Sequence, residues 1–151
     1  MTSTTQSDDL ALDIRDLVLE FGRPPEVVRA LDGVTLAVPK GTILGIVGES
    51  GSGKSTIGFA AGRLMPDGVT PRSGELTLLG KPVWEIDIRE IQAIRQRDLR
   101  YVFQDPIATL DPTKRIGWQV KNAASPTLDD DAVLDALMSV GLTDASRVAA
   151  A

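Results

Sequence analysis

Cysteine and histidine are both absent from this chain of 151 residues, and each absence excludes a class of chemistry. A chain without cysteine has no disulfide framework, no thiolate zinc site and no thiol nucleophile. A chain without histidine has no Ser-His catalytic pair and no histidine-ligated metal. Disulfide scaffolds, Ser-His hydrolases and the commonest zinc centres are therefore excluded.

Basic residues are also outnumbered by acidic ones: the chain has 16 Lys and Arg residues and 21 Asp and Glu residues, a formal net charge of −5. The excess is uneven, because residues 127–151 hold five aspartates against one arginine, while the rest of the chain is nearly balanced. Binding to a phosphate backbone requires a basic surface. We therefore expect no nucleic-acid partner.

Long hydrophobic runs are lacking as well. Residues 1–10 are polar and have no positive region ahead of an apolar stretch, so we expect a disordered tail and not a signal peptide. The longest apolar stretches, such as 42–47, contain glycine and are far too short to span a bilayer. We therefore expect a soluble cytoplasmic chain without a transmembrane segment.

Alternating apolar residues predict two strands in the first forty residues. The first covers 10–21, with a shift in the alternation near Asp16 that indicates a β-bulge, and the second covers 34–38. A turn at 22–25 makes them antiparallel partners. Residues 42–47 are apolar on both faces and rich in β-branched side chains, which predicts a central parallel strand.

Short helices and strands alternate up to about residue 104. We expect helices over 54–64 and 87–97, the second amphipathic, and strands over 74–79 and 99–103. Turns rich in proline and glycine separate these elements.

Only helical periodicity follows. Apolar residues between Leu128 and Val140 recur on one helical face. We expect this helix to begin at a capping box of Thr127 with Asp130 and to end at Gly141. Aspartates in the first turn complement the helix dipole, so the acidic surplus indicates no partner.

A glycine-rich loop lies between residues 42–47 and the helix expected at 54–64. It fits the pattern G-x-x-x-x-G-K-[ST], and both flanking elements are those that the motif requires. A plain glycine-rich turn does not require a lysine at the start of a helix, where a cation interacts unfavourably with the helix dipole. The candidate binding residues are Gly48, Glu49, Ser50, Gly51, Ser52, Gly53, Lys54, Ser55 and Thr56.

Each residue type in the loop suits a phosphate chain. The glycines let the backbone wrap around an oxyanion, so that N–H groups and the helix N-terminus point at a β-phosphate. Lys54 reaches the β- and γ-oxygens, the Ser55 hydroxyl is a hard ligand for Mg²⁺, and Thr56 is placed for the α-phosphate. The loop therefore predicts binding of a nucleoside triphosphate with magnesium.

The loop is followed, about fifty residues on, by the sequence Tyr-Val-Phe-Gln-Asp-Pro at 101–106. Together these stretches resemble the ATP-binding subunit of ABC transporters. Residues 103–112 resemble the Q-loop of the oligopeptide, dipeptide and nickel importer group, with Thr109 and Asp111 where that group typically has Ser and Asn. The resemblance covers residues 12–142, almost the whole chain.

The resemblance implies roles for residues outside the loop. Gln104 would sense the γ-phosphate through Mg²⁺ or the attacking water, and is a candidate catalytic residue and metal ligand beside Lys54 and Ser55. Phe21 would stack on adenine, although an aromatic residue that ends a strand is more often part of a core. Residues 112–120, Pro112 to Val120, would contact the permease, unless Trp118 simply fills a local core.

The fold implied is α/β: a P-loop NTPase core with an N-terminal antiparallel β subdomain, the beginning of an α-helical subdomain and an incomplete sheet. We expect a tail over 1–10, the ATP-binding core over 11–104, and the Q-loop with the start of the helical subdomain over 105–151, truncated at 151.

Hydrolysis in this family also uses a Leu-Ser-Gly-Gly-Gln-like signature, an apolar strand that ends in Asp-Glu, and a switch histidine, and none of these is present. We therefore expect ATP and Mg²⁺ binding without significant ATPase activity in the chain alone. The resemblance also implies a second ATP-binding subunit, identical or not, and a peripheral place on the cytoplasmic face of the membrane, held there by permease subunits that import peptides or related small solutes.

Three other interpretations stay open. ABC-type ATPases also serve outside transport, although those usually carry insertions or basic surfaces after the Q-loop. A second is a GTPase or a small-molecule kinase; a GTPase would need an Asn-Lys-x-Asp or Thr-Lys-x-Asp sequence, and residues 113–116 lack the aspartate. A non-functional fragment with exposed sheet edges would aggregate or pair with another chain.

Overall fold

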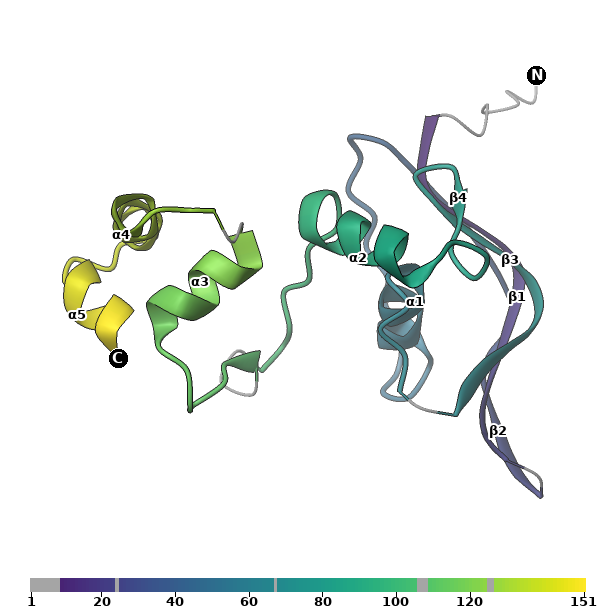
Figure 1. Ribbon diagram of the computed structural model, residues 1–151. Coiled ribbons are helices and arrows are strands. Elements are labelled where there is room, and N and C mark those ends of the chain that lie inside the picture. The colour runs from purple at the N-terminus through teal and green to yellow at the C-terminus, as the bar shows by residue number, and fades with distance from the viewer. Residues whose placement is uncertain (1–8, 24, 67, 106–108, 125–126) are drawn as a thin grey trace. The chain divides into compact units, whose positions relative to one another are not determined.

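The computed structural model describes residues 9–23, 25–66, 68–105, 109–124 and 127–151. The expected tail lies outside them up to residue 8, as do Pro24 of the expected first turn and residues 106–108 of the Q-loop stretch. The chain divides into two compact units, the first ending at Gln92 and the second covering Ala93–Ala151 (Figure 1).

The first unit contains one antiparallel sheet of four strands in the order β2-β1-β3-β4. The strands are β1 (Leu10–Arg23), β2 (Glu26–Pro39), β3 (Val69–Leu78) and β4 (Lys81–Pro82). The predicted antiparallel pairing of the first two strands is confirmed. The strand predicted over 74–79 is confirmed as part of β3, which begins five residues earlier, at Val69, and ends at Leu78. The first two strands are longer than their alternation indicated.

A bulge at Asp16 sets the register of the sheet, as the sequence predicted. Asp16 has a left-handed backbone (φ 46°), and the pairing with β2 shifts between Ile14 and Leu17. Gly74 of β3 lies against it, and a Cβ at Gly74 would be 2.3 Å from the Asp16 carbonyl oxygen. The extra residue returns Leu17 to the inner face, so that Ile14 and Leu17 are both fully buried.

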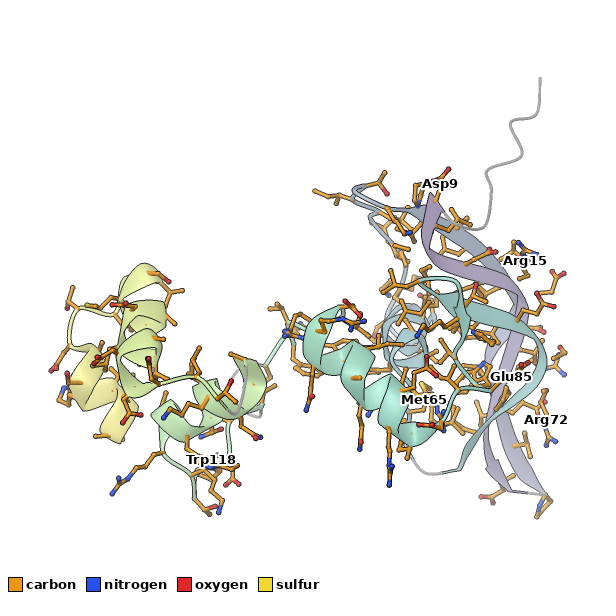
Figure 2. All side chains as sticks on the ribbon, turned by 45° about the horizontal axis from the view of Figure 1, so that its top comes forward. Asp9, Arg15, Met65, Arg72, Glu85 and Trp118 are labelled. Carbon is orange, nitrogen blue, oxygen red and sulfur yellow. The ribbon has the colours of Figure 1, made fainter. Side chains whose placement is uncertain are left out.

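Two helices belong to the predicted elements of this part of the chain, α1 (Lys54–Ala61) and α2 (Ile88–Arg97). The first packs against β2 and β3, with Ala60 and Ala61 buried. The opposite face of the sheet carries charged side chains, among them Arg15 and Arg72 (Figure 2). Arg72 pairs across strands with Glu20 at 2.5 Å. The sheet therefore has one apolar and one charged face.

The prediction of a central parallel strand over Thr42–Val47 is wrong for this structure, and so is the predicted strand over Leu99–Phe103. Both segments lack regular secondary structure, and Val47 and Val102 are 94% and 99% exposed. A parallel strand needs a hydrogen-bonding neighbour and cover on its faces. No parallel pairing occurs among the described residues, so these apolar segments have nothing to pair with.

The second unit beyond α2 is helical, with α3 (Ile116–Ala124), α4 (Asp130–Ser139) and α5 (Ala145–Ala150). Its small core consists of Val133, Leu137 and Ala145. The helix predicted over 128–140 is confirmed as α4, whereas α3 and α5 were not predicted individually.

The predicted capping box of Thr127 with Asp130 is wrong, because the N-cap of the helix lies two residues after Thr127. Asp129 is the N-cap: its backbone is extended, and its Oδ1 accepts a hydrogen bond of 2.8 Å from the Ala132 N–H. The predicted end is confirmed, because Gly141 adopts φ 88° and its N–H donates to the Met138 carbonyl at 2.9 Å.

Replacing the cap should loosen α4. We expect Asp129→Ala to destabilise the helix start by about 1 kcal/mol because the Ala132 N–H loses its acceptor. The measurement is amide hydrogen exchange at Ala132 and Val133. Asp131→Ala is the matched control, since it removes a first-turn charge worth about 0.5 kcal/mol but no cap. Equal protection in both variants would show that Asp129 does not cap the helix.

Candidate phosphate-binding site

The glycine-rich loop leads from the unpaired segment at 42–47 directly into α1, and its last glycine is fixed against the sheet. Gly53 is the N-cap of α1 with φ 87°. A Cβ at Gly53 would lie 2.9 Å from the Ala30 carbonyl oxygen and 2.8 Å from Leu31 Cδ2, both on β2. A side chain at this position would meet both an unfavourable backbone conformation and a collision, so glycine is required.

The Lys54 side chain forms hydrogen bonds with the loop that precedes it. Its ammonium donates to the carbonyl oxygens of Gly48 at 2.9 Å and Glu49 at 2.5 Å, and to Ser52 Oγ at 3.2 Å. The Ser52 N–H also donates to the Glu49 carbonyl at 3.3 Å. The loop is therefore curled around a single positive charge.

The start of α1 suits an anion. No side chain caps the helix, and no acidic residue stands in its first turn. The first N–H groups of an α-helix have no partner within the helix, and together with the dipole they favour a negative ligand. Ser55 is exposed and Thr56 is half-buried at this end.

These groups fit a phosphate chain with a magnesium ion. The backbone N–H groups and the Lys54 ammonium supply hydrogen bonds and positive charge to phosphate oxygens. The Ser55 hydroxyl is a hard oxygen of the kind that Mg²⁺ prefers. No group of three or more acidic residues that could hold a metal occurs in the described part of the chain.

The structure brings together residues 48–56, and the other two candidates belong to other segments of the chain. Gln104 is exposed in a bend of the second unit. Phe21 is half-buried on β1, paired in register with Val28 of β2 and Val69 of β3. The roles of Gln104 and Phe21 stay predictions.

Trp118 on α3 is 52% exposed, so it does not fill a local core. The Lys114 ammonium lies 5.7 Å from the centroid of its ring, within the range of a cation–π interaction. Trp84 is half-buried in the first unit.

Gln119 on α3, which was not predicted from the sequence, holds the turn at residues 111–114. Its Nε2 donates to the carbonyls of Asp111 at 3.0 Å and Lys114 at 2.8 Å, and its Oε1 accepts from the Asp111 N–H at 2.9 Å. A glutamine in a short helix gives no signal for such bonds.

Asp111 braces the same turn with its carboxylate. Its Oδ1 accepts hydrogen bonds from the Thr113 hydroxyl at 2.7 Å and the Thr113 N–H at 2.9 Å. Both bonds favour the ionised form, so they hold the pKa of Asp111 below its ordinary value.

A sequence profile of the ABC transporter family matches residues 31–150. The chain is 39% identical over 116 residues to a probable peptide ABC transporter ATP-binding protein of Sinorhizobium fredii, covering 76% of this chain and 35% of that protein. It is also 39% identical over 111 residues to the oligopeptide transport ATP-binding protein OppD of Bacillus subtilis, covering 72% and 31%. The chain spans about a third of the length of these curated relatives.

Solved structures agree on the fold. An ATP-binding cassette in a dimeric, post-hydrolysis state bound to ADP and phosphate matches 92% of this chain and 60% of its own, with a TM-score of 0.72 and 23% identity. The cbiO1 protein of Clostridium perfringens matches 89% of this chain and 52% of its own, with a TM-score of 0.65 and 25% identity. Within the described residues, every helix is too short or too polar to cross a membrane.

The packing of Gly53 can be separated from its backbone conformation. Gly51 also has a left-handed backbone (φ 82°), but a Cβ there would meet nothing within 4 Å. We expect Gly51→Ala to cost about 1 to 2 kcal/mol of unfolding free energy from conformation alone, and Gly53→Ala to cost about 1 to 3 kcal/mol more from the collision with β2. Urea denaturation measures both, and equal losses would contradict the close approach.

The pKa of Asp111 can be tested through its partner. Thr113→Ala removes the stronger of the two hydrogen bonds, so we expect the pKa of Asp111 to rise toward its ordinary value in a carboxyl-detected NMR titration. Because the pKa is lowered in the folded chain, the stabilisation of the turn is complete above the unfolded value of about 3.9 and is lost as the pH falls through the folded pKa. Thr143→Ala should leave the titration of Asp111 unchanged.

Proposed function

The chain belongs to the ABC transporter family, and from this membership and the geometry of its loop we propose that it binds ATP with Mg²⁺ through residues 48–56. The observation that carries the proposal is the position of the Lys54 ammonium, held by the carbonyls of Gly48 and Glu49 inside a loop that Gly53 fixes to the sheet. Positive charge and free helical N–H groups thus face the same small volume.

Three residues at the end of the loop have proposed roles, together with the backbone of α1. Lys54 exchanges its carbonyl partners for the β- and γ-phosphate oxygens, and the N–H groups at the start of α1 hold the phosphate chain. The Ser55 hydroxyl would be a ligand from this chain for Mg²⁺, and the ion would supply charge neutralisation for the phosphates when bound. We assign Thr56 to the α-phosphate, Gln104 to the metal and the γ-phosphate, and Phe21 to the adenine ring.

We further propose that the protein energises an importer for peptides or related small solutes. The named relatives are peptide and oligopeptide transport ATP-binding proteins, and they match about three quarters of this chain. In this role it would pair with a second ATP-binding subunit and contact permease subunits through residues 112–120, on the cytoplasmic face of the membrane. The exposed ring of Trp118 supports a contact in that region.

In this proposal the chain binds ATP but does not hydrolyse it. The 151 residues contain no histidine and no Gly-Gly pair after Gln104, so the residues that the family uses for its signature sequence and switch are not among them. We expect the chain by itself to bind Mg-ATP and to hydrolyse none at a measurable rate.

Thermal unfolding with and without Mg-ATP tests the proposal. A ligand at 100 times its dissociation constant stabilises a folded binder by about 2.7 kcal/mol, so we expect an upward shift of a cooperative transition. Lys54→Ala should abolish the shift, and Lys40→Ala, a lysine outside the loop, should preserve it. The same samples are assayed for phosphate release.

Three results would contradict the proposal. A chain without a cooperative transition would support the non-functional fragment. A shift that survives Lys54→Ala would place the nucleotide elsewhere. Phosphate release that depends on Lys54 would refute the expected lack of hydrolysis.

A further inference from the structure

Glu20 on β1 forms ion pairs with both of the strands beside it. Its Oε2 lies 2.5 Å from Arg72 Nε on β3, and its Oε1 lies 3.7 Å from Arg29 Nε on β2. The Glu20 side chain is 16% exposed, so water and salt screen its charge less than that of a surface carboxylate. One carboxylate thus joins three strands of the sheet.

Both ladders of β1 are interrupted at the residues just before Glu20. In the register with β2, the step from Leu19 to Glu20 passes two residues of the other strand and leaves Ala30 as an extra residue. In the register with β3, the step from Val18 to Leu19 leaves Arg72 as an extra residue in the same way. A β-bulge disrupts the ladder locally and redirects the side chains that follow it. The ion pairs of Glu20 therefore hold the three strands together where their backbone pairing is weakest.

The bulge on β2 is also the part of the sheet that meets the phosphate loop. A Cβ at Gly53 would lie 2.9 Å from the Ala30 carbonyl oxygen and 2.8 Å from Leu31 Cδ2. Leu31 pairs in register with Leu19, which is fully buried. Phe21 stands two residues further along the same face of β1, about 7 Å away. The contact with the phosphate loop and the aromatic residue are therefore close neighbours on one side of the sheet.

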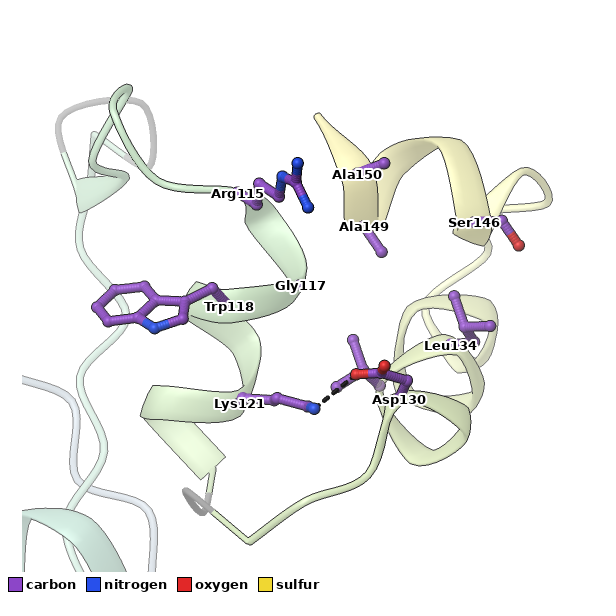
Figure 3. Close-up of a pocket in the computed structure, with 10 residues that line it drawn as sticks. Arg115, Gly117, Trp118, Lys121, Asp130, Leu134, Ser146, Ala149 and Ala150 are labelled. Carbon is purple, nitrogen blue, oxygen red and sulfur yellow. Dashed lines mark ion pairs between the residues drawn. The ribbon is translucent and has the colours of Figure 1, made fainter.

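An ordinary surface ion pair has no such position. Figure 3 shows one on the second unit, where the Lys121 ammonium on α3 lies 2.5 Å from the Asp130 carboxylate on α4. The Asp130 side chain is 91% exposed, and pairs of this kind contribute little because water screens them. Glu20 differs because it is shielded, has two cationic partners and lies beside two bulges.

We propose that Glu20 is a positioning residue for the nucleoside end of ATP, because its ion pairs fix the Phe21 ring relative to the phosphate loop. The inference rests on the proposed function, in which Phe21 stacks on adenine, and adds the group that holds Phe21 in place. Successive side chains of a strand point to opposite faces, so Glu20 lies on the charged face and acts through the strand and not through contact with the nucleotide.

The competing interpretation is that Glu20 only stabilises the sheet. The two interpretations predict different effects on ligands with and without a base. A less stable sheet would weaken every ligand of the phosphate loop by the same factor, because the loop depends on the sheet through Gly53. A displaced Phe21 would weaken only the ligands that carry a base for it to stack on. The ratio of the two affinities therefore separates positioning from stability.

The test compares Mg-ATP with Mg-tripolyphosphate, which has the phosphate chain but no base, by titration calorimetry on the full chain. Glu20→Gln keeps the size of the side chain and removes its charge. We expect it to weaken ATP about fivefold and to leave tripolyphosphate unchanged. Asp13→Asn is the matched control, because Asp13 is also a shielded carboxylate of β1 but pairs with Arg15 in its own strand. It should change neither affinity.

A double-mutant cycle identifies the residue through which Glu20 acts. Phe21→Ala should weaken ATP about tenfold through lost stacking, and adding Glu20→Gln to it should cause no further loss. Arg72→Gln, which leaves Glu20 paired with Arg29, should show the pattern of Glu20→Gln at roughly a twofold loss, and it serves as the test if Glu20→Gln does not fold. In the chain without ligand, amide hydrogen exchange over 20–22 and 27–29 should be faster in Glu20→Gln than in Asp13→Asn.

Three results would overturn the inference: equal weakening of ATP and tripolyphosphate, a further loss when Glu20→Gln is added to Phe21→Ala, or an unchanged affinity for ATP in Glu20→Gln. A parent chain that binds ATP through Lys54 and gives any of these results would refute the positioning role alone. A parent chain that binds neither ligand would refute the proposed nucleotide site, and the positioning role with it.

Discussion

The contact between Gly53 and the carbonyl of Ala30 is the constraint on which the first unit depends. It fixes the end of the glycine-rich loop to β2 at a distance that no side chain tolerates. The start of α1, and with it the direction of its N–H groups, follows from that contact. The bulge at Asp16, packed against Gly74, then sets which residues of β1 face the same side as α1. Backbone approaches at glycine, more than side-chain pairs, thus position the phosphate loop.

The two units achieve rigidity in different ways. In the first, a buried apolar sheet face with Ile14 and Leu17 supports a loop that needs glycine. In the second, the core is small, and a side-chain amide from Gln119 replaces tertiary packing by holding a turn through the backbone. A loop that must wrap a ligand benefits from the absence of side chains, whereas a surface that must display them benefits from a clamp beneath.

The sequence was most informative where structure is set locally. Four features were predicted: the loop motif, α1, α4 with its end at Gly141, and the bulge at Asp16. Each is indicated by a signal that spans only a few residues, namely a glycine, a helical period or the alternation of apolar residues along a strand. The segments at 42–47 and 99–103 were predicted as strands and are not strands. Their apolar composition indicates a preference for burial, but a strand also needs a neighbouring strand to hydrogen-bond with. The cap at Asp129 was misplaced by two residues, since three consecutive aspartates and a threonine can all serve. Gln119 gave no signal, because its three partners are known only once the turn is built.

The hydrogen bonds of Lys54 surround its ammonium with oxygen atoms of its own loop. Its ammonium has three oxygen ligands before any anion enters. At the proposed site, binding of a phosphate would therefore exchange ligands around one cation, and its net free energy would be a difference between two sets of charge-assisted hydrogen bonds. In such an exchange a single small anion gains little over the carbonyls that it displaces. Selectivity then belongs to long ligands that keep Lys54 satisfied while also reaching the helix N–H groups.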